Sequence, residues 1–405
     1  MLVNFITAKI ATIYSMSFIK KFTVLFIVII SLSSLGISVS NKATKVSDET
    51  RNENTDSSLP SEVKETYCLG EVIKIISDLE EELPGGNKQR SQQLLIRVTS
   101  GVDKGKKRST LNLIPDNPAF AIIGEVGKKY LITKVENLTT GDEDYYVVDY
   151  YREPYIWILL GAFLLTLILV GGIKGIRTII SLLCTIAFVA FILIPLIVKG
   201  VNPLLAAVVV SFLSTALTMV LVAGFNFKSL ASTLGTVIGV AIGGIIATFV
   251  IKNAPLSGLA SSEAMILWGN QLYHINFKGL LAAGMIVSCL GAVMDVAISI
   301  SSSIQEIKIA NPEYSLLQLF ASGMNVGKDI MGTMTSTLVL AYTGMALPLL
   351  ILFSNENNPS KYLNLELVTS EITAAIAGSI GLIIAVPVTA VIMSYLASKV
   401  EKIKI

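Results

Sequence analysis

Histidine and cysteine are scarce in this sequence, and their scarcity excludes most metal and nucleophile chemistry. His274 is the only histidine, so a histidine-rich zinc site and a Ser-His-Asp triad are both excluded. The three cysteines are Cys68, Cys184 and Cys289, and the last two lie in apolar runs, so no pair can cross-link a soluble domain. No nucleotide-binding fingerprint occurs either. We therefore predict no metal and no cofactor, and no enzymatic activity except for the aspartyl-type alternative considered below.

Charge is also in short supply, and it is unevenly distributed. Charged residues make up 15% of the chain and hydrophobic residues 53%, whereas soluble proteins carry about 25% charged residues. Residues 42–153 hold 16 of the 31 Lys and Arg and 20 of the 29 Asp and Glu. This pattern predicts a membrane protein with one water-soluble module. The net charge of +2 gives no indication of nucleic-acid binding.

The N-terminal region, residues 1–40, contains an apolar run at 22–37 that follows Lys20 and Lys21. Its length lies between that of a signal peptide and that of a short membrane-spanning helix. Cleavage after the small residues at 38–40 and retention as an anchor both stay open, and either places the following residues outside. Residues 41–65 have almost no large apolar side chains, which predicts a disordered linker.

Residues 66–153 show short alternating runs separated by turn residues, among them GEVIKII, QQLLIRV and DYYVVDYY. Five or so strands of this kind predict a small all-β domain, an OB-like or SH3-like barrel. Basic residues gather at a predicted hairpin tip, at Lys104, Lys106, Lys107 and Arg108. A solvated turn is one explanation for them, and contact with anionic lipid or wall polymer is the other.

The remainder, residues 154–405, reads as a polytopic α-helical membrane bundle of about seven helices, each near the 20 residues that span a bilayer. The predicted spans are 155–173, 177–198, 202–224, 229–251, 279–304, 330–353 and 372–397. Lys and Arg on the side of Lys20 outnumber those on the other side by eleven to four. The positive-inside rule then predicts that residues 41–153 are extracytoplasmic and that the C-terminus is cytoplasmic. Trp157 and Trp268 fall at predicted outer interfaces, in agreement with this orientation.

A polar stripe runs along the predicted helix 279–304. At 100° per residue its members lie within about 40° of one line. They are Gly284, Ser288, Gly291, Asp295, Ser299, Ser302 and Glu306. A charge in mid-membrane costs about 2.5–3.5 kcal/mol, so Asp295 must face protein or water. It either binds a cation or a proton in a pathway or forms a structural hydrogen bond to another helix.

The next predicted helix, 330–353, begins with a second polar face formed by Asp329, Gly332, Thr333, Ser336 and Thr343. Asp329 would lie at the helix start, where a carboxylate suits the positive end of the helix dipole, so a capping role is an alternative to a functional one. Two polar faces on consecutive helices most simply meet. We predict that they line a hydrated cavity open to the cytoplasm.

Small residues predict where helices pack closely. Gly235, Gly239 and Gly243 recur every four residues, which provides a groove for a neighbouring helix. Gly291 is a fourth candidate packing glycine. The last helix repeats the pattern more weakly with Ala377 and Gly381.

Two long motifs suggest a family. The segments GAVMDVAISISSSIQEI (291–307) and GMNVGKDIMGTMTSTLVLAYTG (323–344) resemble the YibE/F-like family, as do the YYREP step into the membrane and the preceding β-rich domain. The resemblance covers about residues 65–400. It implies a multi-pass membrane protein of Gram-positive bacteria, described as a permease without an agreed substrate. Asp295, Lys328 and Asp329 lie in the matching motifs, although the family gives them no roles.

Three functions remain open at this stage. The first is a permease that moves an unknown small solute or ion between helices 279–304 and 330–353, along Asp295, Ser299, Ser302, Glu306, Asp329, Thr333 and Ser336. The second is a non-transporting envelope protein that binds a protein partner through its outer domain or relays a signal. The third is an intramembrane aspartyl protease. The third is opposed by depth, because Asp295 would lie roughly 14 Å above the cytoplasmic end of its helix while Asp329 begins the next one.

Overall fold

The computed structural model describes residues 63–82, 88–137, 141–269, 275–354 and 358–400. The chain forms two compact units that divide between Thr166 and Leu167, inside one long helix. Each unit is described by itself below. The predictions for residues 1–40, for the linker before Val63 and for His274 lie outside the described residues.

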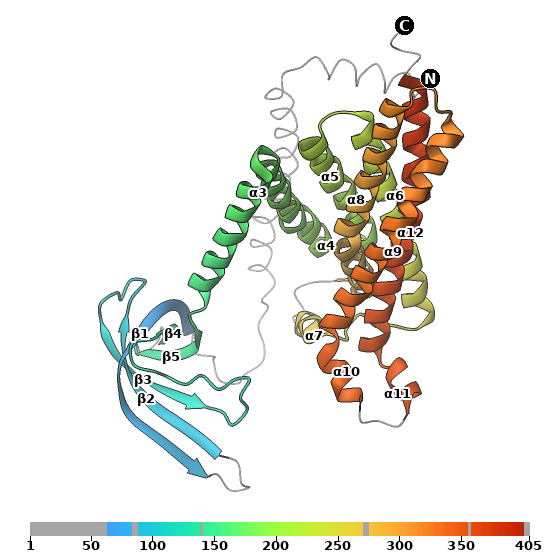
Figure 1. Ribbon diagram of the computed structural model, residues 1–405. Helices are drawn as coiled ribbons and strands as arrows, with labels where there is room; N and C mark the ends of the chain where they lie inside the picture. The colour runs from blue at the N-terminus through green and yellow to red at the C-terminus, as the bar shows by residue number, and fades with distance from the viewer. Residues whose placement is uncertain (1–62, 83–87, 138–140, 270–274, 355–357, 401–405) are drawn as a thin grey trace, which may run out of the picture. The chain divides into compact units, whose positions relative to one another are not determined.

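The N-terminal unit is a five-stranded antiparallel sheet (Figure 1). Its strands are β1 (Val63–Glu82), β2 (Lys88–Val98), β3 (Lys107–Ile114), β4 (Lys129–Asn137) and β5 (Glu143–Tyr150). Their spatial order is β3-β2-β1-β4-β5, and the two end strands β3 and β5 contact each other. Register shifts in β1 supply extra residues that let this strand bend. The predicted all-β domain is therefore confirmed as a curled sheet.

Charged side chains join the two end strands of the sheet. Asp103, in the loop between β2 and β3, accepts hydrogen bonds from Lys134 Nζ at 2.9 Å and from Tyr145 Oη at 3.0 Å. Lys134 also contacts Glu143 at 2.6 Å, and Glu143 accepts from Arg108 of β3 at 3.0 Å. The Asp103 side chain is only 9% exposed and that of Lys134 16%. Part of the predicted basic hairpin tip thus holds the sheet closed instead of facing solvent freely.

Replacing Asp103 with Asn is expected to destabilise the β unit by about 1–3 kcal/mol, because Lys134 loses a charged partner in a site with little water. The Lys106, Lys134 and Tyr145 donors hold the pKa of Asp103 well below its usual range, and Lys134 likewise lowers the pKa of Glu143. Both carboxylates therefore stabilise the fold above the unfolded-state pKa of about 4, and this stabilisation is lost as pH falls through the folded-state pKa. Pulse proteolysis of the full chain at pH 7 and at pH 3 measures both effects. Equal protease resistance of wild type and variant at pH 7 would contradict the prediction.

The C-terminal unit is helical. Its elements are α3 (Glu153–Phe188), which starts in the other unit, the π-helix η1 (Val189–Leu193), α4 (Ile194–Val198), α5 (Pro203–Ala223), α6 (Phe227–Asn253), α7 (Ser262–Gly269), α8 (Phe277–Ala310), α9 (Leu316–Met345), α10 (Leu347–Phe353), α11 (Pro359–Leu363) and α12 (Glu366–Val400). Within the described ranges, five helical segments are long and apolar enough to cross a membrane, or six if α9 and α10 form one bent span. The stretch Glu153–Val198 of α3, η1 and α4 counts as one of the five, although its backbone is not helical at Gly172.

Local sequence signals account for several helix ends. Asn202, Asn226 and Asn276 cap α5, α6 and α8 by accepting hydrogen bonds from backbone N–H groups of the first turn. Ser315 and Gln318 form a reciprocal capping box at the start of α9. Pro348 follows the 65° bend between α9 and α10, where a residue without a backbone N–H fits the first turn of a new helix.

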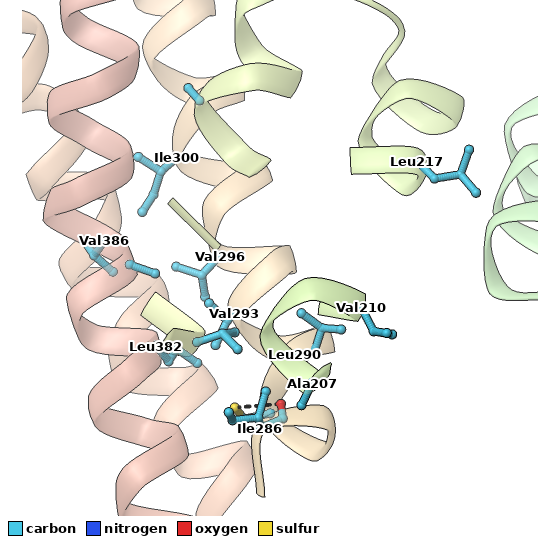
Figure 2. Packing of buried hydrophobic residues seen from close by; sticks show 14 of the residues in the cluster. Ala207, Val210, Leu217, Ile286, Leu290, Val293, Val296, Ile300, Leu382 and Val386 are labelled. Carbon is cyan, nitrogen blue, oxygen red and sulfur yellow. Dashed lines mark hydrogen bonds between the residues drawn. The ribbon is translucent and has the colours of Figure 1, made fainter. Parts of the chain in front are cut away.

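The bundle packs around α8. Figure 2 shows Ile286, Val293 and Val296 of α8 lying between Leu382 and Val386 of α12 on one side and α5 on the other. These residues are nearly inaccessible to solvent. One side of α8 is therefore fixed by α5, α6, α9 and α12, and this determines which side is left open.

Glycines allow α6 and α12 to approach closely. A Cβ atom added at Gly239 would lie 2.6 Å from the backbone oxygen of Gly381, and one added at Gly243 would lie 3.0 Å from that of Ala377. At Gly235 it would meet the Thr389 side chain at 1.8 Å. The three glycines predicted from their spacing thus form one helix contact. Their partners are the small residues of the last helix.

Candidate functional site

The polar stripe of α8 points away from the packed core. Gly284, Ser288, Gly291, Asp295 and Glu306 are exposed, and Ser299 and Ser302 are half-buried. Val293, Ala297 and Ile300, on the opposite side of the same helix, are completely buried. The described helices therefore leave most of the stripe uncovered, although Tyr342 of α9 contacts it at Ser288.

The Asp295 carboxylate has no hydrogen bond and no ion pair with any described residue. Ser299 Oγ donates to the backbone oxygen of Asp295 at 2.7 Å, which leaves the carboxylate itself without a partner. A structural carboxylic acid would be expected to bond across to a neighbouring helix, and none of the described helices supplies such a bond. The structural explanation for Asp295 thus lacks support within one copy of the chain.

The structure corrects the position of Asp329. The helix that carries it begins at Leu316, capped by Ser315, so Asp329 lies more than three turns inside α9 and does not cap it. Hydropathy placed the start too late because Lys328 and Asp329 lower the average there. Asp329, Thr333 and Ser336 are all exposed, on the side of α9 that faces away from the core residues Gly323 and Gly327.

Three contacts set α8 and α9 in antiparallel register. Gly323 lies against Ile304 and Gly327 lies nearest to Val386 and Ile300, and the Ser288 and Tyr342 hydroxyls form a short hydrogen bond. Residues of the two helices at the same depth therefore have numbers that add up to nearly the same total. Asp295 is level with Gly332 to Thr335, and Asp329 is level with about Ser299.

The register of α8 and α9 bears on the protease hypothesis in two ways. The depth difference between the two carboxylates shrinks to roughly 6 Å at 1.5 Å per residue. However, both point away from the α8–α9 contact, and no described contact joins Asp295 to Asp329. An aspartyl protease needs its two carboxylates about 3 Å apart to share a proton. The geometry does not bring them together.

Gly291 is the exception among the predicted packing glycines. It is exposed, and a Cβ atom added there would meet nothing within 4 Å. It belongs to the open stripe of α8 and makes no close helix contact within the described chain. A glycine that faces another helix and a glycine that faces outward look the same in the sequence. Only the side of the helix on which the glycine lies distinguishes Gly291 from the other predicted packing glycines.

Tyr342 was missing from the predicted site, although it joins the two polar helices through Ser288. The sequence did not single it out because it follows the apolar residues LVLA in the segment STLVLAYTG. Thr335 was also missed, and its hydroxyl is buried without a partner at the depth of Asp295. Thr335 lies within the predicted helix 330–353, but at 100° per residue it falls about 100° from the centre of the polar face, so the criterion of a shared face did not select it.

A small cavity lies elsewhere in the bundle, between the N-termini of α5 and α8. Its volume is about 170 Å³, and Asn202, Asn276, Lys252 and Lys278 help to line it. Both lysines are exposed, and each asparagine caps its own helix. Within the described ranges, no cluster of three or more His, Cys, Asp or Glu residues could hold a metal ion.

The fold and the stripe define a class: a polytopic α-helical membrane protein with a curled β domain before its helical bundle. The family model that matches is described as YibE/F-like protein, and it covers residues 159–399. The chain belongs to the YibE/F-like family. The match includes the whole polar region of α8 and α9 and leaves out the β domain. No curated protein and no solved structure matches the chain.

Proposed function

We propose that this chain is a permease for a small cation or a protonated solute, which passes along the polar stripe of α8. The observation that carries the proposal is the unpaired Asp295 carboxylate in the middle of an apolar spanning helix, on a face that also carries Ser288, Ser299 and Ser302. A carboxylate facing lipid would cost about 2.5–3.5 kcal/mol, and water or a passing cation removes that cost.

The proposal includes seven membrane spans. The helical stretch of α3, η1 and α4 holds 46 residues, which as one straight helix would be about 69 Å long, more than twice the hydrocarbon thickness. Gly172 interrupts it with φ 54° and ψ −133°. A Cβ atom at Gly175 would lie 2.0 Å from the Leu167 oxygen, which favours a chain that turns back there. Counting this stretch as two spans, and α9 with α10 as one bent span, gives seven. The β domain then lies outside a Gram-positive cell membrane as an OB-like module.

Reconstitution tests the function. The purified full chain is placed in liposomes, a membrane potential is imposed, and entry of protons and of Na⁺ is followed with trapped fluorescent dyes. We expect faster entry of at least one of these probes than in liposomes without protein. Unchanged entry of both, with the chain shown to be folded and inserted, would count against a cation pathway.

A second candidate function rests on the β domain, as an envelope protein that binds a partner. On β3, Leu111 and Leu113 are exposed while Thr110 and Asn112 are buried, the reverse of the usual pattern. Leu79 of β1 lies on the same face, because both Leu79 and Leu113 pair with Ser91 of β2. Under this alternative the bundle is an anchor, and cells tolerate Asn at position 295.

A further inference from the structure

We propose that a second copy of this chain packs on the exposed faces of α8 and α9 and supplies the missing wall of the polar path. Only one part of this inference rests on the proposed function, namely that the space between the two copies holds water. The packing of two copies follows from the open face itself.

The first step concerns what the open face would meet in a bilayer. Asp295, Lys328 and Asp329 are exposed, and no described residue pairs with their charged groups. The register of α8 and α9 places all three level with the segment 279–305 of α8, in which Asp295 is the only charged residue. Lipid chains cannot cover three charges without a large cost. A polar helix face that is open to lipid also cannot hold a column of water.

The second step identifies the occupant by charge. Lys328 and Asp329 are adjacent and of opposite sign, so a two-fold axis parallel to the membrane normal can bring Lys328 of one copy to Asp329 of the other and the reverse. Within the chain, the apolar run 22–37 is an alternative cover. It contains only Thr23, Ser31, Ser33 and Ser34 as polar side chains and no charge. It could not neutralise Lys328 or Asp329, whereas a second copy neutralises both.

The third step is steric. The N-terminal part of the α8 stripe, from Gly284 to Gly291, consists of small residues. A Cβ atom added at Gly284 or Gly291 would meet nothing within 4 Å. Small residues four apart let two spanning helices approach closely. The hydroxyl of Ser299, one helical turn from Asp295, would then be the stripe hydroxyl nearest to the Asp295 carboxylate of the other copy.

Cross-linking tests the second copy directly. In a full-length variant without Cys68, Cys184 and Cys289, single cysteines are placed at Gly291 and Ser288 on the stripe, and at Ile245 and Phe249 of α6 as controls, which are 62% and 67% exposed. We expect oxidation in native membranes to give covalent dimers for the stripe positions and at least about fivefold less for the controls. The unmodified chain should also show two copies per nanodisc by native mass spectrometry.

The outcomes separate this inference from the proposed function. Dimers that cross-link while hydrophilic thiol reagents fail to label the stripe would keep the second copy and overturn the water path. Labelling of the stripe without cross-links, with a single copy per nanodisc, would overturn the second copy and leave the permease standing.

A charge exchange identifies the pairing. We expect Lys328→Glu alone and Asp329→Lys alone to weaken self-association at least about tenfold, which is 1.4 kcal/mol. When the two variants are co-expressed with different tags, one copy offers two acids and the other two bases, so mixed dimers should form and outnumber like pairs. Equal amounts of mixed and like pairs would contradict the proposed contact.

Discussion

The Gly239→Leu variant is expected to lose the folded bundle. The added Cβ atom alone would lie 2.6 Å from the Gly381 oxygen and 2.8 Å from the Ala385 Cβ, and the first of these atoms is backbone and cannot rotate away. Over-packing of this kind commonly costs 1–3 kcal/mol for a few methylenes, and a leucine against backbone should exceed about 3 kcal/mol. Size-exclusion chromatography and thermal aggregation of the full chain in detergent measure the loss.

Gly161 provides the matched control for this variant. It also lies in a long apolar helix, α3, and a Cβ atom added there would meet nothing within 4 Å. Gly161→Leu should therefore elute and melt like the wild type. If both leucine variants behave alike, whether stable or unstable, the close contact of α6 with α12 is not what holds the bundle together.

The second large effect is expected at Asp295. Asn has nearly the same size but cannot hold a proton or a negative charge, so Asp295→Asn should lower the rate of cation entry into liposomes at least about tenfold. Asp295→Glu keeps the charge and should retain part of the rate. The fold should not change, because the Asp295 carboxylate has no hydrogen bond and no ion pair with a described residue.

Glu263 is the control for charge in general. It is exposed in the short helix α7, away from the polar stripe of α8. Glu263→Gln should leave the entry rate at the wild-type value. A wild-type rate for Asp295→Asn would remove Asp295 from the pathway and favour the envelope function of the β domain.

Much of the architecture could be predicted because periodicity reports directly on burial. The four-residue spacing of Gly235, Gly239 and Gly243 identified a packing groove, and alternation identified the strands of the β domain. Hydropathy did not locate the start of α9. The first turns of this helix, from Leu316, are of mixed polarity, so the apolar stretch that hydropathy detects begins only further along the same helix. The capping box of Ser315 and Gln318 was the available signal for that start.

The direction that each polar residue faces could not be predicted. Asp295 and Asp329 were both recognised as unusual, but whether they meet depends on how α8 and α9 rotate against each other. That rotation is set by Ile300 and Ile304 against Gly327 and Gly323, contacts that no single helix pattern contains. The same gap explains why Gly291 was grouped with packing glycines, although it faces outward.

The central claim is that the α8 stripe faces water inside the membrane, and thiol accessibility tests it most directly. Single cysteines replace Ser299, Ser302, Thr333 and Ser336 in a variant without the native cysteines, and a small hydrophilic thiol reagent is applied to proteoliposomes. Val170, 86% exposed on an apolar helix, and Ile304, fully buried, serve as lipid-facing and core controls. We predict that these four positions, two on the α8 stripe and two on the polar face of α9, react at least about tenfold faster than both controls. Stripe positions that react as slowly as the cysteine at Val170 would mean that no water reaches Asp295 and would contradict the account.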